Sequence, residues 1–213
     1  MKKLLLAITI LGVFAVLILL SEPDFELTTP DISANIALPT STPQEPLLYT
    51  KIDTNSQNVN IEFGESKYLS SWKDKYSAKN VINGSFFNEE WNPAAIVYIN
   101  GEKISSNDLG SSFTGHFYKT MNGEIGIKRT IDNLSIEDSL QGYPLLIEKG
   151  EQLLKSSVNN KRARSAIGVD NDGFVYFIIT NDSHITLLEF TDAILELPIE
   201  FDSVLNLDGA RST

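Results

Sequence analysis

Three short segments of the chain place an amide, a guanidinium and a carboxylate next to hydrophobic runs. Asn83 and Asp208 each follow such a run and precede a glycine, and Arg164 stands just before another run. A carboxylate at a strand end can act as a catalytic acid or base, and a guanidinium can bind a phosphate through two parallel hydrogen bonds. An amide beside exposed backbone N–H groups can hold a ligand oxygen. The three residue types therefore suit hydrolysis or recognition of a phosphate-bearing ligand.

Each segment also has a purely structural interpretation. Asn83-Gly84 and Asp208-Gly209 are favourable turn sequences, and Phe86 beside Phe87 can belong to the core. Arg162 and Arg164 fall on the same side of an extended chain and can form a solvated cationic cluster. Taken singly, the segments do not decide between turn and site.

The elements that must position these residues are mainly strands. Alternating or continuous apolar runs separated by Asn-Gly and Asp-Gly pairs at 100–101, 122–123 and 172–173 predict strands joined by tight turns. Apolar residues at three- and four-residue spacing predict two helices. The predicted class is α+β, a mixed, mainly antiparallel β-sheet with a few packed helices. Strands are expected at 47–52, 59–63, 81–82, 95–99, 113–118, 145–147, 166–169, 174–180 and 203–207, and helices at 70–79 and 186–195.

The N-terminal residues have the composition of a membrane anchor followed by a stalk. Lys2 and Lys3 precede the apolar run Leu4–Leu20, which is long enough to cross a bilayer as a helix and lacks a small-residue cleavage site at its end. The lysines favour a cytoplasmic N-terminus, which places the rest of the chain outside the cytoplasm. Residues 21–46 are rich in proline and acidic residues and predict an extended linker. We therefore expect an anchor or signal peptide at 1–20, a linker at 21–46 and one domain at 47–213.

Composition excludes several classes of function. The net charge of −11 with no basic stretch argues against nucleic-acid binding, and the absence of cysteine excludes disulfides and thiolate chemistry. His116 and His184 have no zinc-ligand spacing, and His116 is more typical of a structural than of a catalytic residue. Glu89-Glu90 predicts a solvated loop, and Asp170–Gly173 predicts a hairpin turn rather than a calcium loop. No metal or other cofactor is expected.

Taken together and in this order, the motifs resemble the phosphodiester glycosidase family, the relatives of the mannose 6-phosphate uncovering enzyme. The family pattern is an N-G-G-F-F turn, an A-R-T-A-I-G strand entry and a terminal N-L-D-G-G-x-S-T loop. Here the corresponding segments are Asn83–Phe87, Ala163–Gly168 and Asn206–Thr213, with Gly142–Ile147 as a fourth similar piece. The resemblance spans residues 47 to 213.

The resemblance implies an extracytoplasmic hydrolase that cleaves a sugar-1-phosphodiester, such as an N-acetylglucosamine-1-phosphate cap, in glycan, exopolysaccharide or wall-polymer metabolism. Arg164 would stabilise the departing phosphate, and Asp208 would act as nucleophile, general base or partner of an oxocarbenium-like centre. Asn83 would complete the catalytic set. The expected substrate-binding residues are Asn206, Gly209, Ser212, Thr213, Arg162, Gly84 and Phe86.

The chain departs from the family pattern at two places. Ser85 replaces the second glycine of the first motif, and Ala210-Arg211 replace a glycine pair in the last, so that we expect a reshaped loop in which Arg211 can add a phosphate contact. The sequence ends directly after that motif, and a truncated product is the expectation. A noncatalytic, surface-anchored binder of phosphorylated glycans is the leading alternative, and a protein without a ligand is the third.

Overall fold

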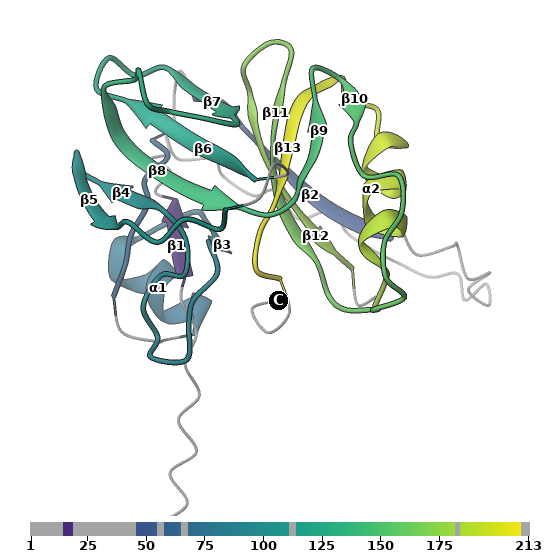
Figure 1. Ribbon diagram of the computed structural model, residues 1–213, viewed down its shortest axis with the longest axis horizontal. Coiled ribbons are helices and arrows are strands. Elements are labelled where there is room, and N and C mark those ends of the chain that lie inside the picture. The colour runs from purple at the N-terminus through teal and green to yellow at the C-terminus, as the bar shows by residue number, and fades with distance from the viewer. Residues whose placement is uncertain are drawn as a thin grey trace, which may run out of the picture.

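The described residues fold into three antiparallel sheets, of six, five and two strands, and two short helices (Figure 1). The computed structural model describes residues 15–18, 46–54, 58–64, 68–110, 114–181 and 184–209. Every strand pairing within these residues is antiparallel. This confirms the mainly antiparallel α+β class that the sequence predicts.

One sheet has six strands in the order β10-β9-β13-β11-β12-β2, the other has five in the order β5-β4-β8-β6-β7, and β1 pairs with β3. Neighbours that are far apart in the sequence, such as β9 and β13, bring the predicted site segments together. The strands are β1 (Ala15–Ile18), β2 (Leu47–Ile52), β3 (Asn80–Asn83), β4 (Val97–Ile99), β5 (Glu102–Ser105), β6 (Gly115–Thr120), β7 (Ile125–Lys128), β8 (Ile136–Gly142), β9 (Leu145–Glu148), β10 (Glu151–Gln152), β11 (Ser165–Asp170), β12 (Val175–Thr180) and β13 (Phe201–Asn206), and the helices are α1 (Leu69–Tyr76) and α2 (Leu187–Leu195).

The main core lies between the two sheets. Phe117 and Leu140 of the five-stranded sheet belong to the same buried cluster as Ile167, Phe177 and Leu205 of the six-stranded sheet. Because side chains alternate along a strand, the neighbouring residues of the six-stranded sheet face the other way and form a second core with α2. The fold is therefore layered as sheet, sheet and helix.

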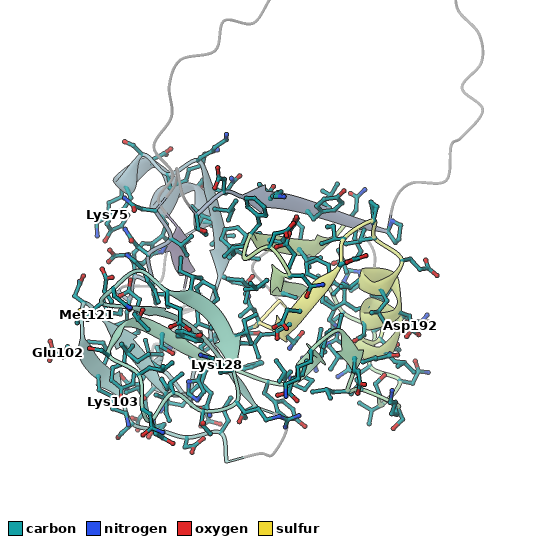
Figure 2. All side chains as sticks on the ribbon, turned by 90° about the horizontal axis from the view of Figure 1, so that it is seen from above. Lys75, Glu102, Lys103, Met121, Lys128 and Asp192 are labelled. Atoms are coloured by element: carbon teal, nitrogen blue, oxygen red, sulfur yellow. The ribbon has the colours of Figure 1, made fainter. Side chains whose placement is uncertain are left out.

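Helix α2 covers the outer face of the six-stranded sheet, on the side away from the five-stranded sheet (Figure 1). Phe190 and Ile194 are fully buried there, as the helical spacing predicts. The helix begins with a capping box, in which the Thr186 hydroxyl accepts from the Glu189 N–H at 3.2 Å and the Glu189 carboxylate accepts from the Thr186 N–H at 2.7 Å. Such a cap contributes about 1 kcal/mol and fixes where the helix starts. Figure 2 shows Asp192 of α2 at one side of the molecule and Glu102 and Lys103 of β5 at the other.

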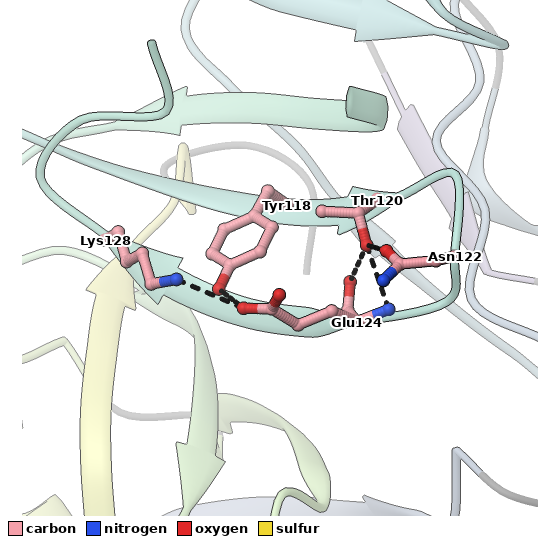
Figure 3. Close-up of polar contacts among 5 residues, drawn as sticks. All are labelled: Tyr118, Thr120, Asn122, Glu124 and Lys128. Atoms are coloured by element: carbon pink, nitrogen blue, oxygen red, sulfur yellow. Dashed lines mark hydrogen bonds and ion pairs between the residues drawn. The ribbon is translucent and has the colours of Figure 1, made fainter. Parts of the chain in front are cut away.

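The three turns predicted from Asn-Gly and Asp-Gly pairs all close hairpins. They join β4 to β5, β6 to β7 and β11 to β12, and their glycines have positive φ. The β6–β7 hairpin is reinforced by side chains (Figure 3): the Tyr118 hydroxyl donates to Glu124 at 2.6 Å, and Lys128 pairs with the same carboxylate at 3.1 Å. At the turn, the Thr120 hydroxyl contacts Asn122 and accepts from the Glu124 N–H. The hairpin is thus held at a defined register.

Two predictions about elements are wrong. Residues 59–63 form no strand, although Val59 and Ile61 are buried, because the alternation reflects burial against the core without a neighbouring strand. The predicted helix over Leu4–Leu20 is wrong at Ala15–Ile18, which form β1 in register with β3, so that Ala15 lies opposite Asn83.

The remaining residues of Leu4–Leu20, and most of the predicted linker at 21–46, lie outside the described residues. Within the ranges that the structure describes, neither helix has the length and apolar character needed to cross a membrane.

Candidate functional site

The register of β11 against β13 places Arg164 opposite Asp208. Ala166 is paired with Asn206, and the ladder continues past the strand end because the Leu207 N–H donates to the Ser165 carbonyl at 2.9 Å. One further step brings Asp208 level with Arg164. In an antiparallel pair, residues that are directly opposite share one face of the sheet. The backbones of the two charged residues predicted from separate motifs therefore lie across from one another at one sheet end.

The first motif reaches this sheet end through its backbone. The Asp208 N–H donates to the Gly84 carbonyl at 3.1 Å, and the Asn83 side-chain amide donates to the Asp208 carbonyl. Asn83 is 1% exposed, and its Oδ1 has no partner among the described residues. One N–H of the Asn83 amide thus holds the Asp208 backbone, and the buried Oδ1 is an acceptor without a partner in that set.

Gly209 is required by close approach of two backbones. A Cβ built on Gly209 would lie 2.6 Å from the Ser165 nitrogen and 2.8 Å from the Arg164 Cα. No side chain fits there, because the atoms that it would meet belong to the main chain. Gly209 is therefore a packing requirement of this chain crossing, and its predicted contact with the substrate stays a prediction.

Asn206 repeats the pattern seen at Asn83. Its amide NH₂ donates to the Tyr143 carbonyl at 2.7 Å, within the fourth motif, and its buried Oδ1 has no partner among the described residues. The neighbouring Ser165 hydroxyl is also buried without a partner in that set. Leaving a buried polar atom unpaired costs about 1–3 kcal/mol. Three such atoms, from Asn83, Asn206 and Ser165, therefore lie near one sheet end.

The Arg164 side chain is half-buried and held by backbone carbonyls. Its Nε donates to the Ile185 carbonyl at 3.2 Å and its Nη2 donates to the Asn160 carbonyl at 2.6 Å. No acidic side chain among the described residues pairs with it, since its hydrogen bonds are those two. Burial, and next the positive charge of Arg162, lower the pKa of Arg164. A buried cation beside a second cation is an arrangement that an anion would stabilise.

Arg162 is exposed and binds the Asn160 side chain through its Nε at 2.9 Å. Its backbone bridges to Ile185, the same residue whose carbonyl receives Arg164. Residue 185 directly precedes the cap of α2, so that the capping box fixes the segment that orients Arg164.

Phe86 and Ser85 serve the loop that carries Asn83. Phe86 is half-buried and its carbonyl accepts from the Ala94 N–H at 2.9 Å. The Ser85 hydroxyl, which replaces the family glycine, donates to the Gln141 carbonyl at the end of β8. This hydrogen bond ties the loop to the five-stranded sheet, and it is an interaction that glycine cannot make.

Some predicted residues lie outside the described residues, namely Ser212, Thr213 and the departure at Ala210-Arg211. Glu89 and Glu90 are exposed, as a solvated loop requires. Asp170 closes the predicted hairpin turn by accepting from the N–H groups of Asp172 and Phe174 at 3.0 and 2.9 Å. Within the described ranges, no three His, Cys, Asp or Glu side chains are grouped closely enough to bind a metal ion.

Comparison with known proteins gives a match at the level of the family. The family described as phosphodiester glycosidase (NAGPA) matches residues 76–213, which is more than half of the chain. A zebrafish N-acetylglucosamine-1-phosphodiester alpha-N-acetylglucosaminidase catalytic domain, auto-inhibited by its pro-peptide, is 17% identical over 60% of this chain and 50% of that chain, with a TM-score of 0.49. A hypothetical protein from Synechocystis is 14% identical over 78% and 52% of the two chains, with a TM-score of 0.47. The chain thus spans about half the length of each structure. No curated protein matches it.

The two histidines differ sharply in environment. His184 is exposed, whereas His116 on β6 is 4% exposed and lines a cavity on the outer face of the five-stranded sheet. Burial is the main reason why the pKa of His116 is lowered from its ordinary 6.5, although nearby Asp108 and Asp132 oppose the effect. The folded protein therefore holds His116 in its neutral form around pH 6.5 and above.

This difference predicts a pH dependence of stability. In the unfolded chain His116 binds a proton near pH 6.5, whereas the folded chain resists protonation, so stability is lost as pH falls below 6.5. The slope is at most about 1.4 kcal/mol per pH unit for one proton. The free energy of unfolding is measured by urea titration between about pH 5 and 8. It should fall less steeply with decreasing pH in His116→Gln than in the parent. His184→Gln is the control and should keep the parental slope. Equal slopes in all three proteins would contradict the assignment.

Proposed function

Because the chain belongs to the phosphodiester glycosidase family, we propose that it hydrolyses the bond between C1 of a sugar and a phosphodiester. The family match confirms the resemblance that the ordered motifs indicate. One observation carries the proposal: Arg164 is half-buried beside Arg162, has no acidic partner among the described residues, and stands opposite Asp208 at one sheet end. That is an anion site with a carboxylate beside it.

The proposed reaction adds water to C1 of the sugar. The C1–O bond breaks, its electron pair stays on the phosphate oxygen, and the products are the free sugar and a phosphate monoester. The second pKa of such a monoester is about 6, so the leaving group is a stable anion at neutral pH. Strong general-acid assistance is then less important than electrostatic stabilisation of the leaving phosphate.

Arg164 would supply that stabilisation. Two of its five N–H groups are used by the Ile185 and Asn160 carbonyls, and those bonds fix the plane of the guanidinium. The other N–H groups remain for phosphate oxygens. Because the side chain is oriented before substrate arrives, little conformational entropy is lost on binding. Arg162 adds positive charge to this region and would strengthen attraction of the phosphate, in a chain whose net charge is −11.

Asp208 would act on C1 or on the attacking water. Its backbone is held on both sides, by Gly84 through its N–H and by Asn83 through its carbonyl. A carboxylate at this position serves as nucleophile or as general base, and either role stabilises the positive charge that develops at C1. The anomeric configuration of the released sugar distinguishes the two roles.

Asn83 and Asn206 would bind sugar hydroxyls. The NH₂ group of each amide is bonded to a backbone carbonyl, and each buried Oδ1 is an acceptor without a partner among the described residues. Phosphate diester oxygens cannot donate a hydrogen bond, whereas sugar hydroxyls can. The two unpaired Oδ1 acceptors therefore suit sugar hydroxyls, and the arginines suit the phosphate.

The site is tested with the purified full chain and an alkyl N-acetylglucosamine-1-phosphodiester, by following release of free sugar. We expect Asp208→Asn to lower kcat by about 10²- to 10⁴-fold, the usual contribution of a positioned acid or base. Arg164→Lys should lower it by about 10²-fold, because lysine keeps the charge but loses the planar fork. Asp192→Asn on α2 is the matched control and should keep the parental rate (Figure 2).

A folded parent that releases no sugar, or an Arg164→Lys variant with undiminished rate, would contradict the proposed roles. Binding of the phosphodiester without turnover, lost in Arg164→Lys, would instead favour a noncatalytic binder of phosphorylated glycans.

We also propose an extracytoplasmic location for the domain. The support is the sequence alone, in which Lys2 and Lys3 precede a long apolar run and favour a cytoplasmic N-terminus. External protease added to spheroplasts should degrade the C-terminal half of the full chain while a cytoplasmic marker stays intact. Protection of the chain until detergent is added would contradict this location.

A further inference from the structure

We propose that the cavity on the outer face of the five-stranded sheet is a second carbohydrate site, which binds an uncharged sugar unit beside His116 and Asp132. The proposal goes beyond the hydrolase site and does not require turnover. It rests on the volume of the cavity, on its mixture of buried polar and apolar side chains, and on its balance of charge.

The cavity measures about 610 Å³, within the range of roughly 300–1,000 Å³ that is typical of small-molecule sites. Apolar surface comes from Tyr98, Ile96 and Ile131, and polar groups come from His116, Gln141 and Asp132. A sugar ring offers both a hydrophobic C–H face and a rim of hydroxyls, so that it matches a wall of this mixed composition.

The polar floor of the cavity is held in place by hydrogen bonds. Gln141 is 2% exposed, its carbonyl Oε1 accepts from the N–H groups of Ile96 and Leu109 at 3.3 and 3.2 Å, and its NH₂ donates to Asp108 at 2.7 Å. The same Asp108 oxygen accepts from the Gly110 N–H at 3.0 Å. These hydrogen bonds fix the loop before residue 110 against β8, so the cavity keeps its shape without a ligand.

His116 supplies the feature that points to a ligand. The side chain is only 4% exposed and lines the cavity, and its Nδ1 has no partner among the described residues. A buried ring nitrogen without a hydrogen bond costs about 1–3 kcal/mol. The cost falls if a hydroxyl in the cavity, from a sugar or a water, engages the imidazole.

The charges around the cavity disfavour an anion. Arg129 is already engaged by Glu148 through two hydrogen bonds at 2.8 Å, from its Nε and its Nη2. Lys103, on β5 at the edge of the sheet (Figure 2), lines the cavity together with two carboxylates, Asp108 and Asp132. Among the described lining residues the two acids are opposed by Lys103 and by an Arg129 that Glu148 already neutralises, so the cavity does not attract a sugar phosphate. The described residues likewise contain no grouping that could bind a metal ion.

Gln141 links this cavity to the hydrolase site. Its backbone carbonyl accepts from Ser85 in the Asn83 loop, while its side chain forms the floor of the cavity. The following residue, Gly142, packs so closely on β13 that a Cβ would lie 2.7 Å from the Asn206 carbonyl. The end of β8 therefore contacts the cavity, the loop that carries Asn83 and the end of β13.

The test is titration of the ¹⁵N-labelled full chain with glucose and with N-acetylglucosamine, neither of which contains phosphate. We expect millimolar affinity and amide shifts in β6, β8 and residues 129–132. Asp132→Asn should weaken binding by about fivefold to tenfold, because the amide still accepts a hydrogen bond but no longer a charge-assisted one. Thr130→Trp should abolish binding, because Thr130 is exposed at the cavity and a ring there would fill it. Asp192→Asn should not change the affinity.

Shifts confined to the segments around Asn83 and Asp208, absence of shifts with both sugars, or an affinity unchanged in Asp132→Asn and Thr130→Trp would each overturn the proposal. His116→Gln adds a readout at the imidazole and should weaken binding, provided that its spectrum shows a folded protein. Because free sugars are not substrates, the titration succeeds or fails independently of the hydrolase proposal, and repeating it in Asp208→Asn makes the separation explicit.

Discussion

The antiparallel ladder between β11 and β13 is the constraint on which the site depends. It sets Arg164 opposite Asp208 only in one register, and a slip by one residue would turn one of them to the other face of the sheet. The register is fixed from both sides, because Ile167 and Leu205 belong to the core between the sheets and Ala166 and Val204 belong to the core under α2. Gly209 then allows the chain after β13 to approach Arg164 closely. Core packing along β11 and β13 therefore determines the positions of Arg164 and Asp208.

Hydrogen bonds use only part of each of the remaining polar side chains at this sheet end. Asn83 and Asn206 use their NH₂ groups to hold backbone carbonyls and keep an acceptor oxygen inward. Arg164 uses two N–H groups to hold itself against the segment before α2 and keeps the others. In each case one part of the side chain fixes its geometry and the other part stays available. Such preorganisation is the main physical source of catalysis by polar sites.

The sequence predicted the hairpins and both helices well, because Asn-Gly and Asp-Gly turns and the spacing of residues such as Phe190 and Ile194 are local signals. It missed β8, whose polar Asp138, Ser139 and Gln141 are buried only by tertiary contacts. A shared site of Asn83, Arg164 and Asp208 was expected only from the family resemblance, because the ladder that joins the last two depends on a pairing of distant strands. The carbonyl partners of Arg164, the role of Gly209 and the cavity at His116 depend on loop conformation and had no local signal.

The most direct test is to determine which bond of the phosphodiester breaks. Turnover of an alkyl N-acetylglucosamine-1-phosphodiester in oxygen-18-labelled water should give a phosphate monoester without the label, because water attacks C1 and the leaving phosphate keeps its own oxygens. Mass spectrometry of the monoester reports this outcome and avoids the free sugar, whose anomeric oxygen exchanges with water. Label in the monoester would show attack at phosphorus. That result would contradict a site in which Asp208 acts at the sugar and Arg164 receives the departing phosphate.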